Sequence, residues 1–327
     1  MAPIPLSILD LAPVRHGETA RDSFAVSVAL ARLAEEAGYQ RVWYAEHHNM
    51  PTIASSATSV LIAHVAAHTA RIRLGAGGVM LPNHAPLVIA EQFGTLAALH
   101  PGRIDLGLGR APGSDRNTMY ALRRDNTSAD RFPHDVLELQ AYLADESVVP
   151  GVHAYPGRGS RVPLYVLGSS LFGASLAAAL GLPYAFASHF APAALHEAVA
   201  LYRRDFQPSE QLERGYVIAG VNVIVADTQA DADDQLHRAL RARVRALARP
   251  GRRLTDDEAD LVLASAEGAQ VTQMLRYAAV GRPTDVHEYL EQFTKQADAD
   301  ELIVALQSPE AAARLRSAEL LAAEMIG

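Results

Sequence analysis

Short apolar runs alternate with long amphipathic segments from one end of this 327-residue chain to the other. A short apolar run bounded by turn residues is typical of a buried strand, and apolar positions three and four apart are typical of a helix. The pattern predicts eight strands, at 4–11, 41–46, 71–77, 102–109, 163–168, 184–188, 216–226 and 301–306. Strands separated by helices pair in parallel through right-handed crossovers, and eight such units close a (β/α)8 barrel.

An open, doubly wound sheet would use the same local signals, and periodicity alone does not separate it from a barrel. The count of eight and the absence of a break in composition favour the barrel. We therefore expect one α/β TIM-barrel domain over residues 1–327. Two regions exceed a minimal barrel, 110–162 and 249–283, and we expect both to be insertions, the second a mobile segment after strand seven.

Composition narrows the classes of partner. The net charge is −8 and no basic stripe is present, so nucleic acid is not an expected partner. There is no cysteine, which excludes disulfides and thiolate chemistry and fits a cytoplasmic location. The N-terminus lacks a basic leader, and Ser175, Gly181 and Pro183 interrupt the most apolar stretch, so neither export nor a membrane span is expected.

The sequence WYAEHHNMP places Glu46, His47 and His48 directly after the second predicted strand. A buried charge is costly unless it is paired, so three polar groups at a strand end rarely serve packing. The carboxyl ends of barrel strands converge on one mouth, where enzymes of this architecture place their sites. No further carboxylate or imidazole is spaced to complete a recognisable metal set, and we expect no metal. His64 and His68, one helical turn apart, are expected to form a surface or helix-packing pair.

Two glycine-containing turns are candidates for phosphate binding. GLGRAPG, at 107–113, lacks the spacing of a dinucleotide fingerprint and has a proline where a helix should open, but Arg110 stands at a strand end. LGSSLFGAS, at 167–175, joins a strand to a helix, so Gly168, Ser169, Ser170 and Gly173 surround a helix N-terminus, which favours an anion. The alternative for the second turn is an ordinary serine N-cap.

The third predicted strand ends in GAGGVMLPNHAP, at 75–86. Glycine weakens a strand unless something approaches its backbone or an unusual dihedral angle is required. A flat ring lying against Gly77 and Gly78 is the functional interpretation. A simple turn before Pro82 is the alternative.

Four segments, in this order, resemble the bacterial luciferase-like flavin-dependent monooxygenases: AEHH, GAGGVMLPNHAPLVIAEQ, HPGRIDLGLGR and PLYVLGSSLFGASLAAALGLPYAFA. The resemblance implies FMN, with its phosphate held by Arg110 and the 168–173 turn. It also implies a non-proline cis peptide at Gly77–Gly78 and a mobile lid at 249–283. His47 matches the family's catalytic histidine, and Glu46 would orient it.

Two departures limit the resemblance. Gly109 stands where luciferase has a reactive cysteine, and Ser169 stands where it has a glutamate, so light emission with long aldehydes is not implied. Asp10, His84 and His189, each at or just past a strand end, are candidates for substrate contact.

The resemblance implies a monooxygenase that uses reduced FMN and dioxygen to oxidise a small organic substrate. It further implies a separate NAD(P)H:flavin reductase and a homodimer. A deazaflavin (F420)-dependent oxidoreductase and a catalytically idle flavin-binding protein are the alternatives.

Overall fold

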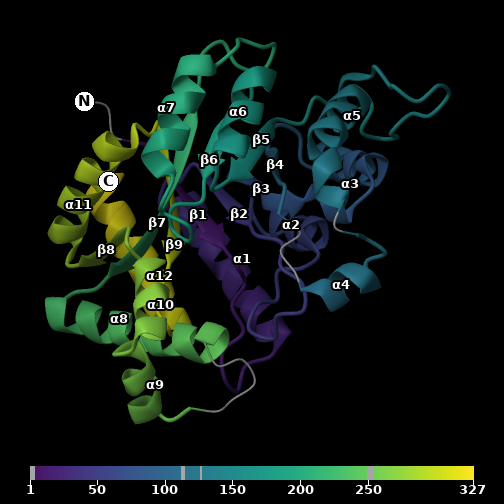
Figure 1. The fold of residues 1–327 in the computed structure, drawn as a ribbon. Coiled ribbons are helices and arrows are strands. Elements are labelled where there is room, and N and C mark those ends of the chain that lie inside the picture. The colour runs from purple at the N-terminus through teal and green to yellow at the C-terminus, as the bar shows by residue number, and fades with distance from the viewer. Residues whose placement is uncertain (1–3, 112–114, 126, 249–253) are drawn as a thin grey trace.

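The computed structural model describes residues 4–111, 115–125, 127–248 and 254–327. Nine strands form one sheet, in the order β6-β5-β4-β3-β2-β1-β9-β7-β8, and a β6–β7 pairing closes all of them except β8 into an eight-stranded parallel barrel (Figure 1). The predicted (β/α)8 barrel is therefore confirmed. The strands are β1 Leu6–Asp10, β2 Arg41–Tyr44, β3 Arg73–Met80, β4 Ile104–Gly109, β5 Leu164–Gly168, β6 Tyr184–Phe186, β7 Val217–Val225, β8 Ala278–Gly281 and β9 Glu301–Leu306.

Helices cover the outside of the barrel, and their ends follow local sequence signals. Thr19 and Asp22 form a capping box at the start of α1, and Pro86 opens α3. No helix of the described residues is both long and apolar enough to cross a membrane. The helices are α1 Ala20–Glu36, α2 Thr58–Ala66, α3 Pro86–Leu99, α4 Arg116–Ala121, α5 Phe132–Ala144, α6 Leu171–Leu180, α7 Leu195–Asp205, α8 Gln229–Arg243, α9 Asp256–Leu263, α10 Ala266–Gln273, α11 Pro283–Ala297 and α12 Ala311–Met325, with short turns η1 Leu81–Asn83, η2 Ser128–Arg131 and η3 Val244–Ala248.

The sequence did not predict strand β8. It pairs only with the second half of β7, from Asn222 to Val225, while the first half of β7 closes the barrel against β6. The region predicted as an insertion, 249–283, contains α9, α10 and β8, which gather near α8 at the end of the barrel where β7 ends (Figure 1). The predicted mobility falls in part on residues 249–253, which lie outside the described residues.

The core has two layers because neighbouring residues of a strand face opposite sides of the sheet. The larger layer lies between the strands and the surrounding helices. The smaller one fills the barrel and consists of Leu9, Trp43, Ala45, Tyr165, Ala185, Ile218 and Ile303.

The glycines of β3 have a packing role in this interior. A Cβ atom at Gly75 would lie 2.7 Å from the Cβ of Asp105, and one at Gly77 would lie 2.9 Å from the Cβ of Trp43. Only glycine therefore fits beside these inward side chains. The peptide bond between Gly77 and Gly78 is cis, as the resemblance predicts.

A polar network closes the end of the barrel at which the strands begin, and we call this end the floor. Arg41 donates to both carboxylate oxygens of Glu301, at 2.9 and 3.1 Å, and to Asp105 at 2.7 Å. Tyr216 also donates to Glu301, at 2.8 Å, and Trp43 donates to Asp105 at 3.1 Å. Every charge of the floor therefore has an opposite charge in hydrogen-bonding contact.

Candidate active site

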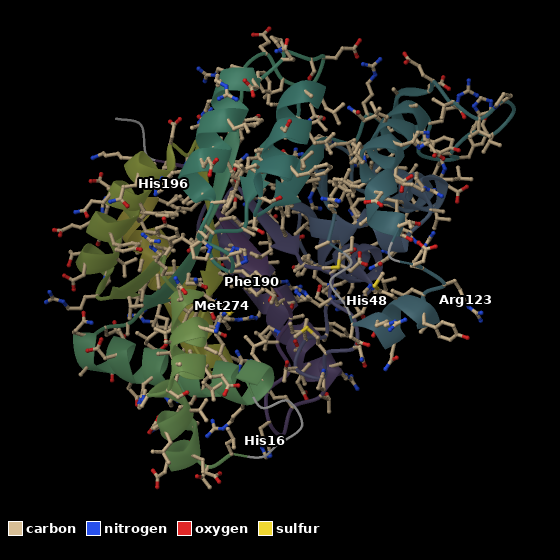
Figure 2. The ribbon with its side chains drawn as sticks, viewed as in Figure 1. His16, His48, Arg123, Phe190, His196 and Met274 are labelled. Atoms are coloured by element: carbon tan, nitrogen blue, oxygen red, sulfur yellow. The ribbon has the colours of Figure 1, made fainter. Side chains whose placement is uncertain are left out.

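The predicted catalytic residues follow β2 at the C-terminal end of the barrel, which we call the mouth. His48 after β2 and Phe190 after β6 lie toward this same end (Figure 2). A cavity of about 490 Å³ opens here, lined by His47, Asn49, Met50, Pro51, Ile53 and Ser56. The mouth is therefore the region in which to look for binding and catalysis.

Glu46 is the centre of a hydrogen-bonded cluster that joins the ends of β2 and β3. Its Oε1 atom lies 2.7 Å from Nε2 of His48 and 2.8 Å from Nε2 of His84, and its Oε2 accepts from the Met80 amide at 3.0 Å. Glu46 was predicted to orient His47. Its hydrogen bonds instead hold the other two histidines, His48 and His84. The Nδ1 atom of His47 has no hydrogen-bond partner, so Glu46 does not hold His47 through this atom.

The electrostatics of the cluster favour an ionised Glu46. Burial by itself would raise the pKa of this carboxyl, but hydrogen bonds from His48 and His84 outweigh burial and hold the pKa below its ordinary value. The bond to Glu46 in turn raises the pKa of His48. Glu46 is thus a charged acceptor that fixes two imidazoles and one backbone amide.

The same three side chains are the part of the mouth that could hold a metal ion. The ligand atoms of Glu46, His48 and His84 all lie within 4.8 Å of one another. Sequence spacing did not reveal the group because His84 is 38 positions beyond Glu46 and only the barrel brings them together. Their separations are hydrogen-bond lengths, so the cluster is satisfied as a hydrogen-bonded unit.

His47 has a different environment from its neighbours. Its backbone amide donates to the Ser55 carbonyl at 3.0 Å, but its buried Nδ1 atom has no hydrogen-bond partner. Burial, as the largest cause, lowers the pKa of His47, so the imidazole is neutral near pH 7. A neutral imidazole with a free nitrogen, bordering a cavity, is suited to accept or hold a proton.

His189 occupies the mouth from the other side. A Cβ atom at Gly220 would lie 2.3 Å from Nδ1 of His189, so the glycine of β7 makes room for this ring. Burial, then the charges of Arg243 and His47, lower the pKa of His189 to about 4. Its Nδ1 also has no partner, which leaves two buried imidazole nitrogens unsatisfied at this end of the barrel.

The predicted phosphate residues are brought together between β4 and α6. Ser170 is the N-cap of α6 without a side-chain hydrogen bond, so the first amides of this helix remain unpartnered by a cap. The guanidinium of Arg110 lies over the ring of Phe172 in the first turn of the same helix, 4.2 Å from its centroid. A positive side chain beside uncapped helix amides fits a phosphate group, so the residues present suit the FMN that the family implies.

Asp10 has a place other than the predicted one. Its carboxylate accepts from Ser27 at 2.6 Å, from the Ala12 amide at 2.8 Å and from Arg314 at 3.1 Å. Ser27 and Arg314 belong to α1 and α12, so Asp10 faces the helix layer, whereas Leu9 faces the barrel interior. Asp10 is a structural ion-pair partner, and no substrate contact is assigned to it.

The expectation that His64 and His68 form a surface or helix-packing pair is confirmed. Both are exposed, His64 on α2 and His68 in the turn after it, their rings meet edge to face with centroids 4.7 Å apart, and Nδ1 of His68 lies 2.8 Å from the His64 carbonyl oxygen. Three other mouth residues were missed by sequence reasoning: Asn222, Arg243 and Gln307. Nothing in the local sequence distinguishes them from ordinary strand, helix and loop residues.

Comparison with known proteins gives a consistent class. The family model for luciferase-like monooxygenases matches residues 5–301. A luciferase-like monooxygenase of Escherichia coli K12 is 49% identical over 320 residues, which are 97% of this chain and 96% of that protein. The crystal structure of apo-MsnO8 superposes with a TM-score of 0.88 at 36% identity and covers 98% of both chains.

More distant structures agree in fold alone. The oxygenating constituent of 3,6-diketocamphane monooxygenase from Pseudomonas putida, in complex with FMN, has a TM-score of 0.73 at 17% identity, covering 98% of this chain and 97% of that one. An F420-dependent secondary alcohol dehydrogenase has a TM-score of 0.71 at 16% identity, covering 98% and 99%.

The fold and the mouth therefore define a flavin-dependent monooxygenase built on a TIM barrel. The chain belongs to the luciferase-like monooxygenase family.

Proposed function

We propose that the protein is an FMN-dependent monooxygenase that takes up reduced FMN, uses dioxygen, and oxidises a small organic substrate in the mouth. The observation that carries this proposal is Arg110 beside the uncapped start of α6. Gly168 and Gly173 lie close there, since a Cβ at Gly168 would be 3.8 Å from the Gly173 Cα, which leaves the backbone open to a phosphate. Gly77 and Gly78 would face the isoalloxazine ring.

Reduced FMN, when bound, supplies the electrons that activate dioxygen. The chain's own part is to position and to handle protons. His47 would hold or move a proton at Nδ1, because that atom is buried, unpartnered and borders the cavity. Glu46 would act as a positioning residue through His48 and His84, both of which it binds. His84 and His189 remain the proposed substrate contacts.

Replacement of Arg110 tests the phosphate site. A charge-assisted hydrogen bond contributes about 1.5–3 kcal/mol, so Arg110→Ala should weaken FMN binding by roughly one to two decades while changing riboflavin binding little. The measurement is a fluorescence titration of both flavins. Arg131→Ala is a matched control, because Arg131 is an exposed arginine of a neighbouring segment paired with Asp135. Unchanged FMN affinity in Arg110→Ala would remove Arg110 from the site.

We also propose that a separate NAD(P)H:flavin reductase supplies the reduced FMN. The helix after β4, where a nucleotide cradle would lie, has only 6 residues and begins at Asp115, whose carboxylate accepts from the amides of Asn117 and Thr118. A carboxylate at that helix start repels a pyrophosphate. Anaerobic stopped-flow mixing of the FMN complex with NADH or NADPH should therefore show slow flavin bleaching that becomes rapid when reductase is added. Rapid bleaching without reductase would contradict the two-component proposal.

The alternative cofactor is F420, since the fold is shared with F420-dependent enzymes. Arg110 and α6 recognise a phosphate and do not separate the two cofactors. Parallel titration with FMN and F420 decides between them, and FMN is expected to bind more tightly. A protein that binds FMN but oxidises nothing when reduced flavin and dioxygen are present would be the idle flavin-binding alternative.

We propose a cytoplasmic homodimer. Large apolar side chains are exposed on the neighbouring helices α2, α3 and α5, where Val60, Leu99 and Leu137 are 67%, 64% and 51% exposed. Exposed apolar side chains on helices that lie side by side suit contact with a second copy of the chain. Light scattering after size exclusion should give twice the chain mass of 35.1 kDa.

A further inference from the structure

Arg243 is an arginine of the mouth that has no carboxylate partner. It is the last residue of α8 and is partly buried, and its side chain makes one hydrogen bond to a described residue, from Nη2 to Oε1 of Gln307 at 3.1 Å. No described carboxylate lies within ion-pair distance of it, and the residues outside the described ranges include no Asp or Glu. A partly buried cation without a counter-ion lowers the free energy of unfolding, so the presence of an arginine here calls for an explanation.

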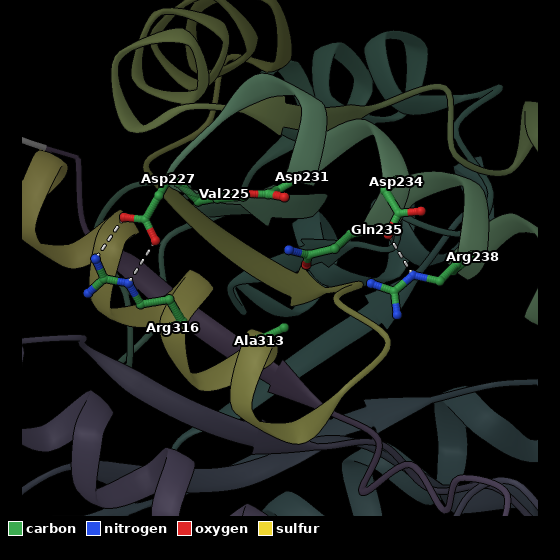
Figure 3. A pocket seen from close by; sticks show the side chains of 9 residues that line it. Val225, Asp227, Asp231, Asp234, Gln235, Arg238, Ala313 and Arg316 are labelled. Atoms are coloured by element: carbon green, nitrogen blue, oxygen red, sulfur yellow. Dashed lines mark hydrogen bonds and ion pairs between the residues drawn. The ribbon is translucent and has the colours of Figure 1, made fainter.

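The other arginines of α8 and η3 differ from Arg243 in having carboxylate partners. Arg238 pairs with Asp234 and Glu310 on the outer face of α8, and Figure 3 shows the first of these ion pairs. Arg241 pairs with Asp256 and Asp260, and Arg245 pairs with Asp256. The segment therefore has acidic partners for every arginine around Arg243, and Arg243 alone of these four lacks one.

Neutral amides hold Arg243 in place. Asn222 donates through Nδ2 to the carbonyls of His189 and Tyr277, so its Oδ1 is the atom that accepts from Gln307, at 2.8 Å. Gln307 must then present its NH2 group to Asn222, which leaves its Oε1 for Arg243. This chain of bonds orients the guanidinium without neutralising its charge, and most of its five N–H donors have no acceptor among the residues that the structure describes.

The position of this group in the barrel separates it from the proposed flavin phosphate. Gln307 follows β9 and Arg110 follows β4, and in the ring β4-β3-β2-β1-β9 the two strands are four places apart, half of the eight-stranded circumference. His189 lies next to Arg243, since the charge of Arg243 contributes to the low pKa of that imidazole. The unpaired guanidinium therefore lies near Gln307 and His189, on the side of the mouth opposite Arg110.

We propose that Arg243 anchors the carboxylate of an organic-acid substrate on the side of the mouth opposite the flavin phosphate. A single guanidinium matches a planar carboxylate through two parallel hydrogen bonds. This inference rests on the proposed function for the reaction, but the anion site itself does not depend on FMN.

The test compares two probes of equal length, hexanoate and hexanamide, by isothermal titration of the FMN-loaded protein. Wild type and the control Arg238→Gln should bind hexanoate at least about tenfold more tightly than hexanamide, the effect of one charge-assisted contact. Arg243→Gln should lose this preference, and Arg243→Lys should retain part of it. Equal binding of the two probes by wild type, or an unchanged preference in Arg243→Gln, overturns the proposal, as does tighter binding of inorganic phosphate than of hexanoate.

A stability measurement separates an anchor from a structural arginine. Without ligand, Arg243→Gln should unfold at the same urea concentration as wild type or a higher one, because an unpaired charge has been removed. A clear loss of stability in Arg243→Gln overturns the anchor. If the protein takes up no FMN, the proposed function fails, and the same titration on the flavin-free protein still decides whether Arg243 binds a carboxylate.

Discussion

The two ends of the barrel treat buried polar groups in opposite ways. At the floor, Arg41 is bound by Glu301 and Asp105, and both carboxylates are completely buried. At the mouth, Nδ1 of His47 and of His189 have no partner, and Arg243 has no carboxylate among the described residues. The floor is satisfied as it stands, whereas the mouth contains polar groups without a partner among the described residues, which a ligand could satisfy.

The two arginines show what this difference means physically. Burial lowers the pKa of both, but at Arg41 the charges of Glu301 and Asp105 outweigh burial and raise the pKa above the ordinary value. At Arg243 burial is not offset, and the pKa stays below the ordinary value. Arg41 therefore stabilises the fold at the floor, whereas Arg243 is available to bind a ligand at the mouth.

The largest expected effect comes from breaking the floor. Arg41→Met leaves Glu301 buried without its counter-ion and leaves Asp105 with Arg73 alone, which should reduce the free energy of unfolding by about 3–5 kcal/mol. Urea unfolding followed by circular dichroism measures this loss. The control is Arg238→Met, which breaks a surface pair and should cost less than about 1 kcal/mol. Equal losses in the two variants would show that the floor is no stronger than a surface ion pair.

A smaller effect, at the mouth, depends on pH. The pKa of His189 falls from 6.5 to about 4 on folding, so the unfolded chain binds more protons between these values and stability falls as pH is lowered through this window. The loss reaches about 3 kcal/mol once the pH has fallen to the folded-state pKa near 4, from roughly 1.4 kcal/mol for each pKa unit.

His189→Gln should therefore lose less stability than wild type between pH 7 and pH 4.5, as urea unfolding at the two pH values measures. His64→Gln, on the surface of α2, serves as control and should follow wild type. A wild-type pH dependence that persists in His189→Gln would show that the acid sensitivity does not come from His189.

The smallest effect on stability is expected at His47. Its buried Nδ1 has no hydrogen-bond partner among the described residues, so His47→Gln should change the free energy of unfolding by less than about 1 kcal/mol. Oxidation supported by reduced flavin should nevertheless slow by roughly 10²–10⁴-fold, the range for loss of a general acid or base. Thermal unfolding and turnover of the same preparation measure both. If most of the His47→Gln protein fails to fold, and the folded fraction oxidises substrate at the normal rate, the role of His47 is structural.

Local sequence was sufficient where the signal is carried by neighbouring residues. Seven of the predicted strands match β1 to β7 within a few residues and the eighth is β9, because apolar periodicity records which residues a strand buries. Arg110 and the α6 turn could be predicted for the same reason, since a strand end and a helix start are both local. The strand β8 was missed because its four residues, AAVG, are too few to show a period.

What the tertiary structure alone decided concerns partners that are distant in the chain. Whether Asp10 faces substrate or helices depends on a one-residue alternation that the apolar strand IPLSILDL does not reveal, and the structure pairs it with Arg314. Glu46 and His84 became one cluster only when β2 and β3 paired. The lack of a counter-ion at Arg243 is likewise visible only in the tertiary structure. The sequence gives the charge of a side chain, but whether an opposite charge neutralises it depends on which groups the fold places around it.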